Sequence, residues 1–315
     1  MAITRFRNIY LNIARKKELA MIHICLATDD NFSKYCQICI HETILHKKED
    51  TSIHFYVLGD KLSDTSVFEM FNEIPNITVT VIPVDSSKIV DPNFKYRFCP
   101  GLTTFARYVI TELEELKDID RVLYLDSDII VKGDLTELYN IDLENNPIGG
   151  VKNPWIIYTN RVTDTINAGV LVMDLVKLRE DNFAKKCITN TLNNKTNDEM
   201  IINGIYSRKI KFLSVIYNFP YSLVIRKAPR MCDINTYIEH YSVPYKSMKE
   251  LIENAVVLHL VGFKTLYKNM YLRSNVVSEK LQELVSSRLE KFIQTKEYTP
   301  IQIDNDLNTV FGEYE

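Results

Sequence analysis

Apolar and polar positions change period along the first 130 residues, in a way that predicts strands and helices in turn. Some segments carry continuous or alternating apolar residues, as strands do, and others carry apolar residues at helical spacing. The strand-like segments are 21–30, 52–59, 76–84 and 121–131, and the helix-like segments are 33–47, 63–73 and 103–116. This β-α-β-α rhythm predicts an α/β fold with a mainly parallel sheet that helices cover on both faces.

The second half of the chain is less regular. It predicts strands at 166–175 and 254–263, a helix at 197–206, and an exposed amphipathic helix at 275–293 that a polar tail follows. We find no internal repeat and no low-complexity linker. We therefore expect a basic N-terminal segment over 1–20, one domain over 21–268, and a C-terminal helix and tail over 269–315.

The N-terminal segment has its own pattern. Apolar residues fall on one side of a helix and basic residues surround them, which is typical of a segment attracted to an anionic membrane surface. A short helix packed on the domain is the alternative. The apolar residues are Ile3, Phe6, Ile9, Tyr10 and Ile13, and the basic ones are Arg5, Arg7, Arg15, Lys16 and Lys17.

Composition narrows the class of protein. Apolar residues make up 46% and charged residues 25% of the 315 residues, as in ordinary globular proteins, and a net charge of −3 gives no basic field for nucleic acid. No apolar run approaches the roughly 18–20 residues that span a bilayer, and MAITRFRNIY lacks the apolar core of a secretory signal. The six cysteines lie mostly in apolar surroundings, which favours reduced thiols and a cytoplasmic protein. Cys36 and Cys39 have no second pair at zinc spacing, so we expect them to line a helix in the core.

Two aspartates follow directly on a buried strand. Asp126 and Asp128 come after the apolar run VLYL, where an uncompensated carboxylate is costly. Side chains at positions i and i+2 of a strand point the same way, about 6.5–7 Å apart at Cα, so both carboxylates can converge on one cation. Oxygen ligands suit Mg²⁺ or Mn²⁺, and an added histidine favours Mn²⁺.

Glycine-rich phosphate loops are absent from the sequence. The chain has nine glycines, and neither G-x-G-x-x-G nor G-x-x-x-x-G-K-[ST] occurs. Phosphates would therefore need a metal and side chains to hold them. This pattern favours a metal-clamped nucleotide-sugar site over a dehydrogenase or a P-loop ATPase.

Five motifs in order resemble glycosyltransferase family 8, which contains bacterial lipopolysaccharide glucosyl- and galactosyltransferases and glycogenin. They are LATDDNF (26–32), TTFARY (103–108), VLYLDSDIIV (122–131), NAGVLVMDL (167–175) and HLVGFK (259–264). The resemblance runs from about Ile22 to Lys264. It implies a GT-A fold, which is Rossmann-like with a mixed, mainly parallel sheet, and a catalytic domain over 21–268.

The resemblance also implies roles for individual residues. The nucleotide-sugar would contact the opening loop, the arginine helix, the D-x-D strand, the glycine strand and the last block. These residues are Thr28, Asp29, Asp30, Asn31, Arg107, Asp126, Ser127, Asp128, Asn167, Ala168, Gly169, Gly262 and Lys264. The implied metal ligands are Asp126, Asp128 and His259, and the implied catalytic residues are Asp198, Glu199 and Arg107.

The activity that the resemblance implies is a retaining transfer of glucose or galactose from a UDP-sugar. The acceptor would be a glycan or glycolipid, such as lipopolysaccharide, lipooligosaccharide or another cell-surface polysaccharide, and the cofactor Mn²⁺ or Mg²⁺. We expect a cytoplasmic enzyme, which residues 1–17 could attach peripherally to the membrane unless they pack on the domain.

The sequence departs from the family at two places. Glu199 stands where the family usually has glutamine, beside the reacting carbon, so it could act as a nucleophile or stabilise an oxocarbenium-like state. It could equally reflect a different choice of donor. In the last block, Lys264 comes one place early and the usual Pro-Trp is missing.

Two other interpretations stay open at this point. Phosphotransferases of the haloacid dehalogenase kind also carry D-x-D after an apolar strand, but they set it at the first strand and have Thr or Val where this chain has Ile130. A non-catalytic nucleotide-sugar binding protein is the other.

Overall fold

The structure is a computed structural model. It describes residues 21–96, 101–153, 164–220, 241–260 and 283–302, the last range without residues 293, 296 and 298. The N-terminal segment, Gly262 and Lys264 lie outside the described residues. Among the described helices, none has the length and apolar character needed to cross a membrane.

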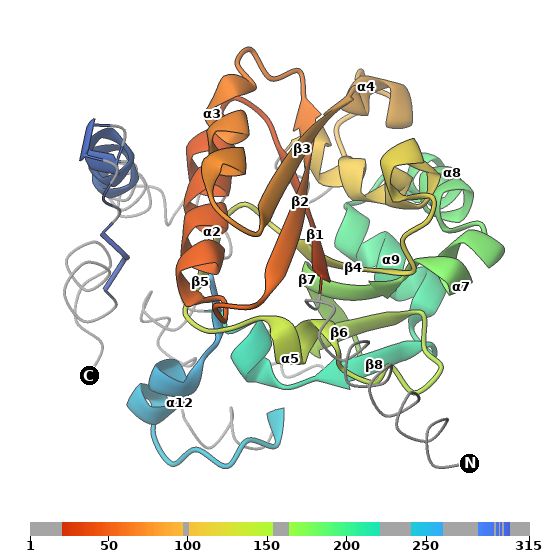
Figure 1. The fold of residues 1–315 in the computed structure, drawn as a ribbon. Coiled ribbons are helices and arrows are strands. Elements are labelled where there is room, and N and C mark those ends of the chain that lie inside the picture. Colours follow the sequence, from red (N-terminus) through yellow and green to blue (C-terminus); the bar gives the residue numbers. More distant parts are fainter. Residues whose placement is uncertain are drawn as a thin grey trace, which may run out of the picture.

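A seven-stranded mixed sheet forms the centre of the molecule, in the order β3-β2-β1-β4-β7-β6-β8 (Figure 1). Its strands are β1 (Met21–Thr28), β2 (Ser52–Asp60), β3 (Ile77–Val84), β4 (Arg121–Leu125), β6 (Ile148–Lys152), β7 (Ile166–Asp174) and β8 (Ile210–Leu213). Strands β1 to β4 run parallel, and β6 pairs parallel with β8, whereas β7 runs antiparallel to both of its neighbours. The predicted α/β fold with a mainly parallel sheet is confirmed.

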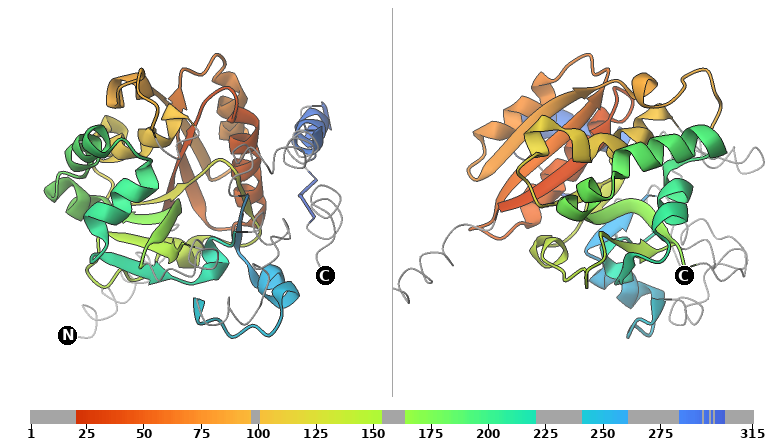
Figure 2. Two further views of the ribbon diagram at one scale, coloured as in Figure 1. Left: turned by 180° about the vertical axis from the view of Figure 1, so that it is seen from behind. Right: turned by 90° about the vertical axis from the view of Figure 1, so that its right-hand side faces the viewer.

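Helices cover both faces of this sheet, as the two views of Figure 2 also show. On one face, α2 (Ser33–His46), α3 (Ser66–Glu69) and η1 (Met70–Glu73) share an apolar cluster with Ile22, Ile24 and Leu26 of β1. On the other face, a second cluster contains Cys25 and Ala27 of β1. It is built with α4 (Ser86–Ile89), η2 (Leu102–Glu112), η3 (Glu114–Leu116), α7 (Leu175–Glu180), α8 (Phe183–Asn194) and α9 (Asp198–Tyr206). Side chains of β1 alternate between the two clusters because strand residues point to opposite faces in turn.

Helix α2 is buried on two sides. Cys36 and Cys39 are free thiols with no exposed surface, so their predicted place in the core is confirmed. Residues 283–292 are helical and bury Val285 and Leu289 in the same cluster as α2. The rest of the predicted helix, 275–282, lies outside the described residues.

The C-terminal segment 283–302 contacts α2 through side chains and backbone, as three interactions show. The His41 and Phe292 ring centroids lie 4.2 Å apart, and the amide of Ile301 donates to the buried carboxylate of Glu42 at 3.0 Å. The Lys34 ammonium donates to the Ser286 hydroxyl at 3.1 Å. The C-terminal segment therefore packs on the domain rather than extending away from it.

The prediction of one continuous strand over 121–131 is wrong. The chain leaves the central sheet after Leu125, and β5 (Ile129–Val131) forms a separate two-stranded sheet with β9 (Val257–His259). Asp126 and Asp128 lie in the break between the two strands, where a carboxylate without a partner would be costly between apolar layers. The remaining described elements are α5 (Thr136–Tyr139), η4 (Val215–Tyr217) and α12 (Met248–Asn254).

Candidate active site

The end of β4 and the start of β7 lie side by side. Leu125 pairs with Val170, and the amide of Asp126 donates to the carbonyl of Gly169 at 2.8 Å. Because β7 runs antiparallel to β4, its first residues, which include Asn167 and Ala168, meet the D-x-D directly. The two segments lie about 40 residues apart in the chain, and this strand pairing brings them together.

His259 reaches the same place from β9, which is more than 130 residues further along the chain than Asp126. The ladder between β5 and β9 sets His259 opposite Ile129, and the amide of Leu260 donates to the carbonyl of Asp128 at 3.0 Å. On its other side, the amide of His259 donates to the carbonyl of Phe219 at 2.8 Å. The backbone on both sides of the histidine therefore fixes its position.

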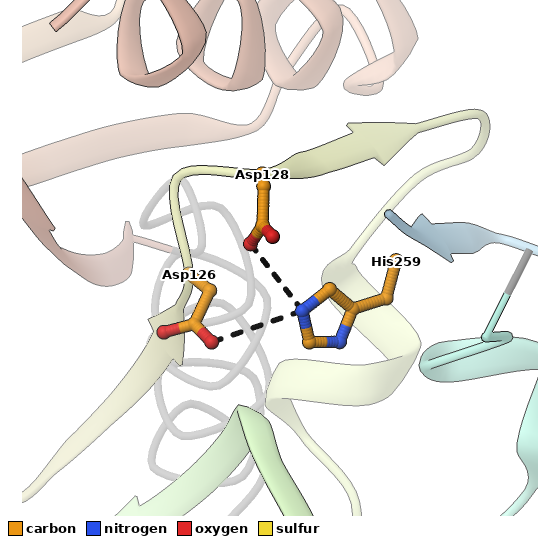
Figure 3. Close-up of side chains that lie close together, drawn as sticks. All are labelled: Asp126, Asp128 and His259. Carbon is orange, nitrogen blue, oxygen red and sulfur yellow. Dashed lines mark ion pairs between the residues drawn. The ribbon is translucent and has the colours of Figure 1, made fainter. Parts of the chain in front are cut away.

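Asp126, Asp128 and His259 converge on one point (Figure 3). The Nε2 atom of His259 lies 3.3 Å from Oδ1 of Asp128 and 3.8 Å from Oδ2 of Asp126. One ligand atom from each residue lies within 4.8 Å of the other two. Two carboxylate oxygens and one imidazole nitrogen, all facing one point, fit a divalent cation such as Mn²⁺ or Mg²⁺.

The two carboxyl groups differ in their proton affinity. Burial raises the pKa of Asp126 above its ordinary value, and the Arg107 charge offsets this only in part. Burial acts on Asp128 as well, but the charge and hydrogen bond of His259 outweigh it and hold the pKa of Asp128 below its ordinary value. Burial likewise lowers the pKa of His259, and the charge and hydrogen bond of Asp128 more than reverse this effect. The site thus gathers negative charge that cations compensate.

Arg107 is buried between carboxylates and carbonyls. Its guanidinium contacts Asp126 at 2.7 Å and Asp198 at 2.9 Å, and it donates to the carbonyl of Ala168 at 2.6 Å. The guanidinium also lies 4.4 Å from the ring centre of Tyr124. With an exposed fraction of 3%, Arg107 is occupied in holding Asp126 and the start of β7 in place.

Asp198 and Glu199 occupy the first turn of α9. The side chain of Asn197 accepts from the Met200 amide and caps this helix. Asp198 accepts from the Thr104 hydroxyl at 2.7 Å, on the segment that carries Arg107. Asp198 therefore holds the Nε atom of Arg107 while Asp126 contacts its Nη2 atom.

Glu199 lies against the start of β7. Its Oε2 accepts from the side chain of Asn167 at 3.0 Å and from the amide of Ala168 at 3.2 Å, and its Oε1 accepts from Asn153 at 2.5 Å. Burial raises the pKa of Glu199 to about 7, although the hydrogen bonds from Ala168 and Asn153 oppose the shift. Glu199 thus changes charge near neutral pH.

The residues of the opening loop lie at the neighbouring strand end. Oδ1 of Asp29 accepts from the Phe32 amide at 3.0 Å and its Oδ2 from the Thr103 hydroxyl at 3.3 Å. Asp30 accepts from the Ser63 amide at 2.9 Å.

Thr28, Asn31 and Ser127 belong to the same region as Asp29 and Asp30. Thr28 is fully buried at the end of β1, and Asn31 follows in the loop. The hydroxyl of Ser127 donates to the carbonyl of Ala27 at 2.8 Å, which ties the end of β1 to the D-x-D turn. The acidic segments that follow β1 and β4 therefore lie at neighbouring strand ends.

Four polar residues around the site were not singled out from the sequence: Thr104, Asn153, Asn203 and Asn218. Asn203 accepts from the Ile166 amide at 2.8 Å and donates to the Ile166 carbonyl at 2.8 Å and to the Glu199 carbonyl at 2.9 Å, so it fastens α9 to β7. Asn218 is hydrogen-bonded to His259 at 2.9 Å. Thr104 is part of the TTFARY motif, whereas Asn153, Asn203 and Asn218 belong to no motif, and only the folded chain brings them to the site.

We predict that Gly169→Ala disrupts the cation site. A Cβ at this position would lie 2.1 Å from Cε1 of His259 and 2.9 Å from Oδ2 of Asp126, so the imidazole and the carboxylate must separate. Isothermal titration with Mn²⁺ should give an affinity at least about 10-fold weaker than that of the wild type. Gly204→Ala is the matched control, because nothing lies within 4 Å of its added Cβ. Unchanged affinity in Gly169→Ala would show that the cation binds elsewhere.

We predict that Glu199→Gln becomes more stable relative to the wild type as pH rises from 5 to 8. The raised pKa of about 7 means that ionisation of Glu199 destabilises the folded wild type from about pH 4.5 upward through pH 7, and glutamine does not ionise. The difference in Tm should grow by at least about 2 °C, or roughly 1 kcal/mol. Glu73→Gln, at an exposed position of η1, is the control. An equal difference at both pH values would contradict the raised pKa.

Comparisons with known proteins identify the family of the chain. The family model described as Glycosyl transferase family 8 matches residues 23–265. A putative glycosyltransferase of Haemophilus influenzae is 29% identical over 71% of this chain and 72% of its own length. Lipopolysaccharide 1,3-galactosyltransferase of Salmonella typhimurium is 25% identical over 75% of each chain. Glycosyltransferase GlyF of Streptococcus pneumoniae is 27% identical over 67% of this chain, which spans 52% of GlyF.

Solved structures share the fold. The galactosyltransferase LgtC, in complex with donor and acceptor sugar analogs, aligns with a TM-score of 0.61 at 21% identity and covers 90% of this chain and 98% of its own. Glycosyltransferase GlyE of Streptococcus pneumoniae aligns with a TM-score of 0.59 at 20% identity, over 90% of this chain and 66% of its own. The predicted GT-A fold is confirmed. Since the family model spans residues 23–265 of 315, the chain belongs to glycosyl transferase family 8.

Proposed function

We propose that the protein is a metal-dependent, retaining glycosyltransferase that moves glucose or galactose from a UDP-sugar to a glycan acceptor. One observation carries the proposal. In a family 8 chain, Asp126, Asp128 and His259 meet at the carboxyl end of a central strand, where open α/β sheets bind their ligands.

The ligand set matches the chemistry of this reaction. As the bond between the anomeric carbon and the diphosphate oxygen breaks, negative charge develops on the leaving diphosphate. A divalent cation held by Asp126, Asp128 and His259 would supply Lewis-acid stabilisation of that charge. The chain itself contributes the fixed ligands, and the Arg107 and Asp198 pair prevents Asp126 from turning away.

Other residues of the site have roles in this proposal. Asn167, Ala168 and Gly169 line the sugar side of the site, and the loop of Asp29 to Asn31 receives the uridine. Gly262 and Lys264 would meet the phosphates, and Asp198 would contact the transferred sugar.

Glu199 would stabilise positive charge on the sugar. Oε2 of Glu199 already accepts two hydrogen bonds, so Oε1 is the oxygen with a lone pair left for attack on carbon. A role through charge therefore fits these contacts better than a role as nucleophile.

We infer the class of acceptor from the relatives of the chain and not from the site itself. The Salmonella relative is a lipopolysaccharide galactosyltransferase, and the LgtC structure holds donor and acceptor sugar analogs. We infer a glycolipid or cell-surface polysaccharide acceptor, such as lipopolysaccharide or lipooligosaccharide. Four described cysteines are free and buried, in keeping with a cytoplasmic enzyme. Membership of family 8 disfavours the phosphotransferase interpretation, and turnover separates an enzyme from a non-catalytic binding protein.

We predict that the protein hydrolyses one UDP-hexose slowly without acceptor, in the presence of Mn²⁺ and not of EDTA. A panel of UDP-, GDP- and CMP-sugars, with nucleotide release as the readout, identifies the donor. Asp128→Asn should lower turnover at least about 100-fold, because the metal contributes several kcal/mol to charge stabilisation.

Asp142→Asn is the matched control for this experiment, since Asp142 is exposed and its side chain accepts from the Glu144 amide. Equal turnover in Mn²⁺ and EDTA would contradict the metal. No turnover of any donor, together with no thermal shift on adding UDP, would contradict the whole proposal. Release of phosphate from simple phosphomonoesters would instead favour the phosphotransferase.

We propose further that residues 1–17 attach the enzyme to an anionic membrane that carries its acceptor. The full chain should sediment with phosphatidylglycerol vesicles and not with phosphatidylcholine vesicles, and salt should release it. Deletion of residues 1–17 should abolish this binding and leave UDP-sugar hydrolysis unchanged. Vesicle binding that survives the deletion would contradict the proposal.

A further inference from the structure

Asn218 connects the cation end of the site to the sugar end. It follows η4 directly, has an exposed fraction of 3%, and lies between two side chains of the site. Its Oδ1 is 2.9 Å from Nδ1 of His259, and its Nδ2 donates to Oδ1 of Asn167 at 2.9 Å. No motif in the sequence includes this residue.

The backbone sets the direction of these hydrogen bonds. The amide of Gly169 can only donate, and it donates to the side chain of Asn167 at 3.0 Å, so the atom of Asn167 at that point is its oxygen. The atom of Asn218 that faces this oxygen must then be its NH₂ group. Consequently the carbonyl oxygen of Asn218 faces His259, and Nδ1 of His259 must carry the hydrogen.

This arrangement selects one tautomer of His259. With the hydrogen on Nδ1, the lone pair of the neutral ring is on Nε2, the nitrogen nearest Asp128 and Asp126. A histidine binds a metal through such a lone pair, and the partner of its other nitrogen decides which one is available. The opposite tautomer would leave the Asn218 oxygen facing a bare nitrogen.

The same chain of bonds reaches Glu199. Asn167 presents its oxygen to Asn218 and Gly169, so its NH₂ group is left to donate to Oε2 of Glu199 at 3.0 Å. Asn218 thus orients Asn167 as well as His259. The buried amide of Asn218 therefore fixes the orientation of a side chain at each end of the site.

We infer that Asn218 is a positioning residue, which fixes the tautomer of His259 for metal binding and the amide orientation of Asn167 for contact with Glu199. The inference rests on the proposed metal-dependent function. Asn218 acts through His259 and Asn167, and it need not touch the metal or the sugar itself.

Two substitutions separate the two bonds. Asn218→Ala removes both. Asn218→Asp keeps an oxygen that accepts from Nδ1 of His259 but has no hydrogen to give to Asn167. Mn²⁺ affinity, measured by the loss of the free-ion electron paramagnetic resonance signal in the presence of UDP, should fall about 10- to 100-fold in Asn218→Ala and stay within about 3-fold of the wild type in Asn218→Asp.

UDP-hexose hydrolysis should fall in both variants, because each loses the bond to Asn167. Thr191→Val, which removes a buried hydrogen bond to Tyr108, controls for lost stability and should leave Mn²⁺ affinity unchanged. If Asn218 had only a structural role, its substitution would lower the Tm, but the Mn²⁺ affinities of Asn218→Asp and Asn218→Ala would not differ.

A measurement on the wild type does not depend on whether the Asn218 variants fold. Nitrogen-15 NMR of histidine-labelled protein with Mg²⁺ and UDP, assigned with His259→Gln, should show hydrogen on Nδ1 of His259 and none on Nε2. Hydrogen on Nε2, unchanged Mn²⁺ affinity in Asn218→Ala, or equal loss in both folded variants would overturn the inference. No Mn²⁺ binding by the wild type would instead overturn the metal site on which it rests.

Discussion

Charge compensation at the end of β4 is the constraint on which the site depends. Asp126, Asp128 and Asp198 bring three carboxylates together, and the guanidinium of Arg107 and the imidazole of His259 face them. Buried carboxylates of like charge are costly without such partners. The arrangement leaves one point between Asp126, Asp128 and His259 where a further cation fits.

The fold meets this constraint by strand pairing rather than by loops. The antiparallel β7 starts beside the end of β4, and the β5–β9 ladder sets His259 opposite the residue after Asp128. Backbone hydrogen bonds therefore fix the position of each of the three candidate metal ligands. Gly169 has to be glycine because the imidazole of His259 fills the space of its Cβ. Rigid ligand positions of this kind reduce the cost of binding a cation in one geometry.

Much of this could be predicted from the sequence. The period of apolar residues predicted the strands. Two carboxylates after the run VLYL predicted a cation site, because a buried carboxylate is costly unless a positive charge compensates it. The role of His259 came from the resemblance to the family and not from its apolar surroundings. Asn218 could not be predicted, since an asparagine before Phe219 has no local signal and acquires its partners only through the pairing of Phe219 with β9. The break between β4 and β5 was missed because both halves are apolar.

The central claim is that Asp126, Asp128 and His259 hold one divalent cation. The most direct measurement is anomalous diffraction at the manganese edge, from crystals grown with Mn²⁺ and UDP. The account predicts a single strong peak within about 2.5 Å of a carboxylate oxygen of each aspartate and of Nε2 of His259. Crystals that bind UDP with no manganese peak at these three residues would contradict it.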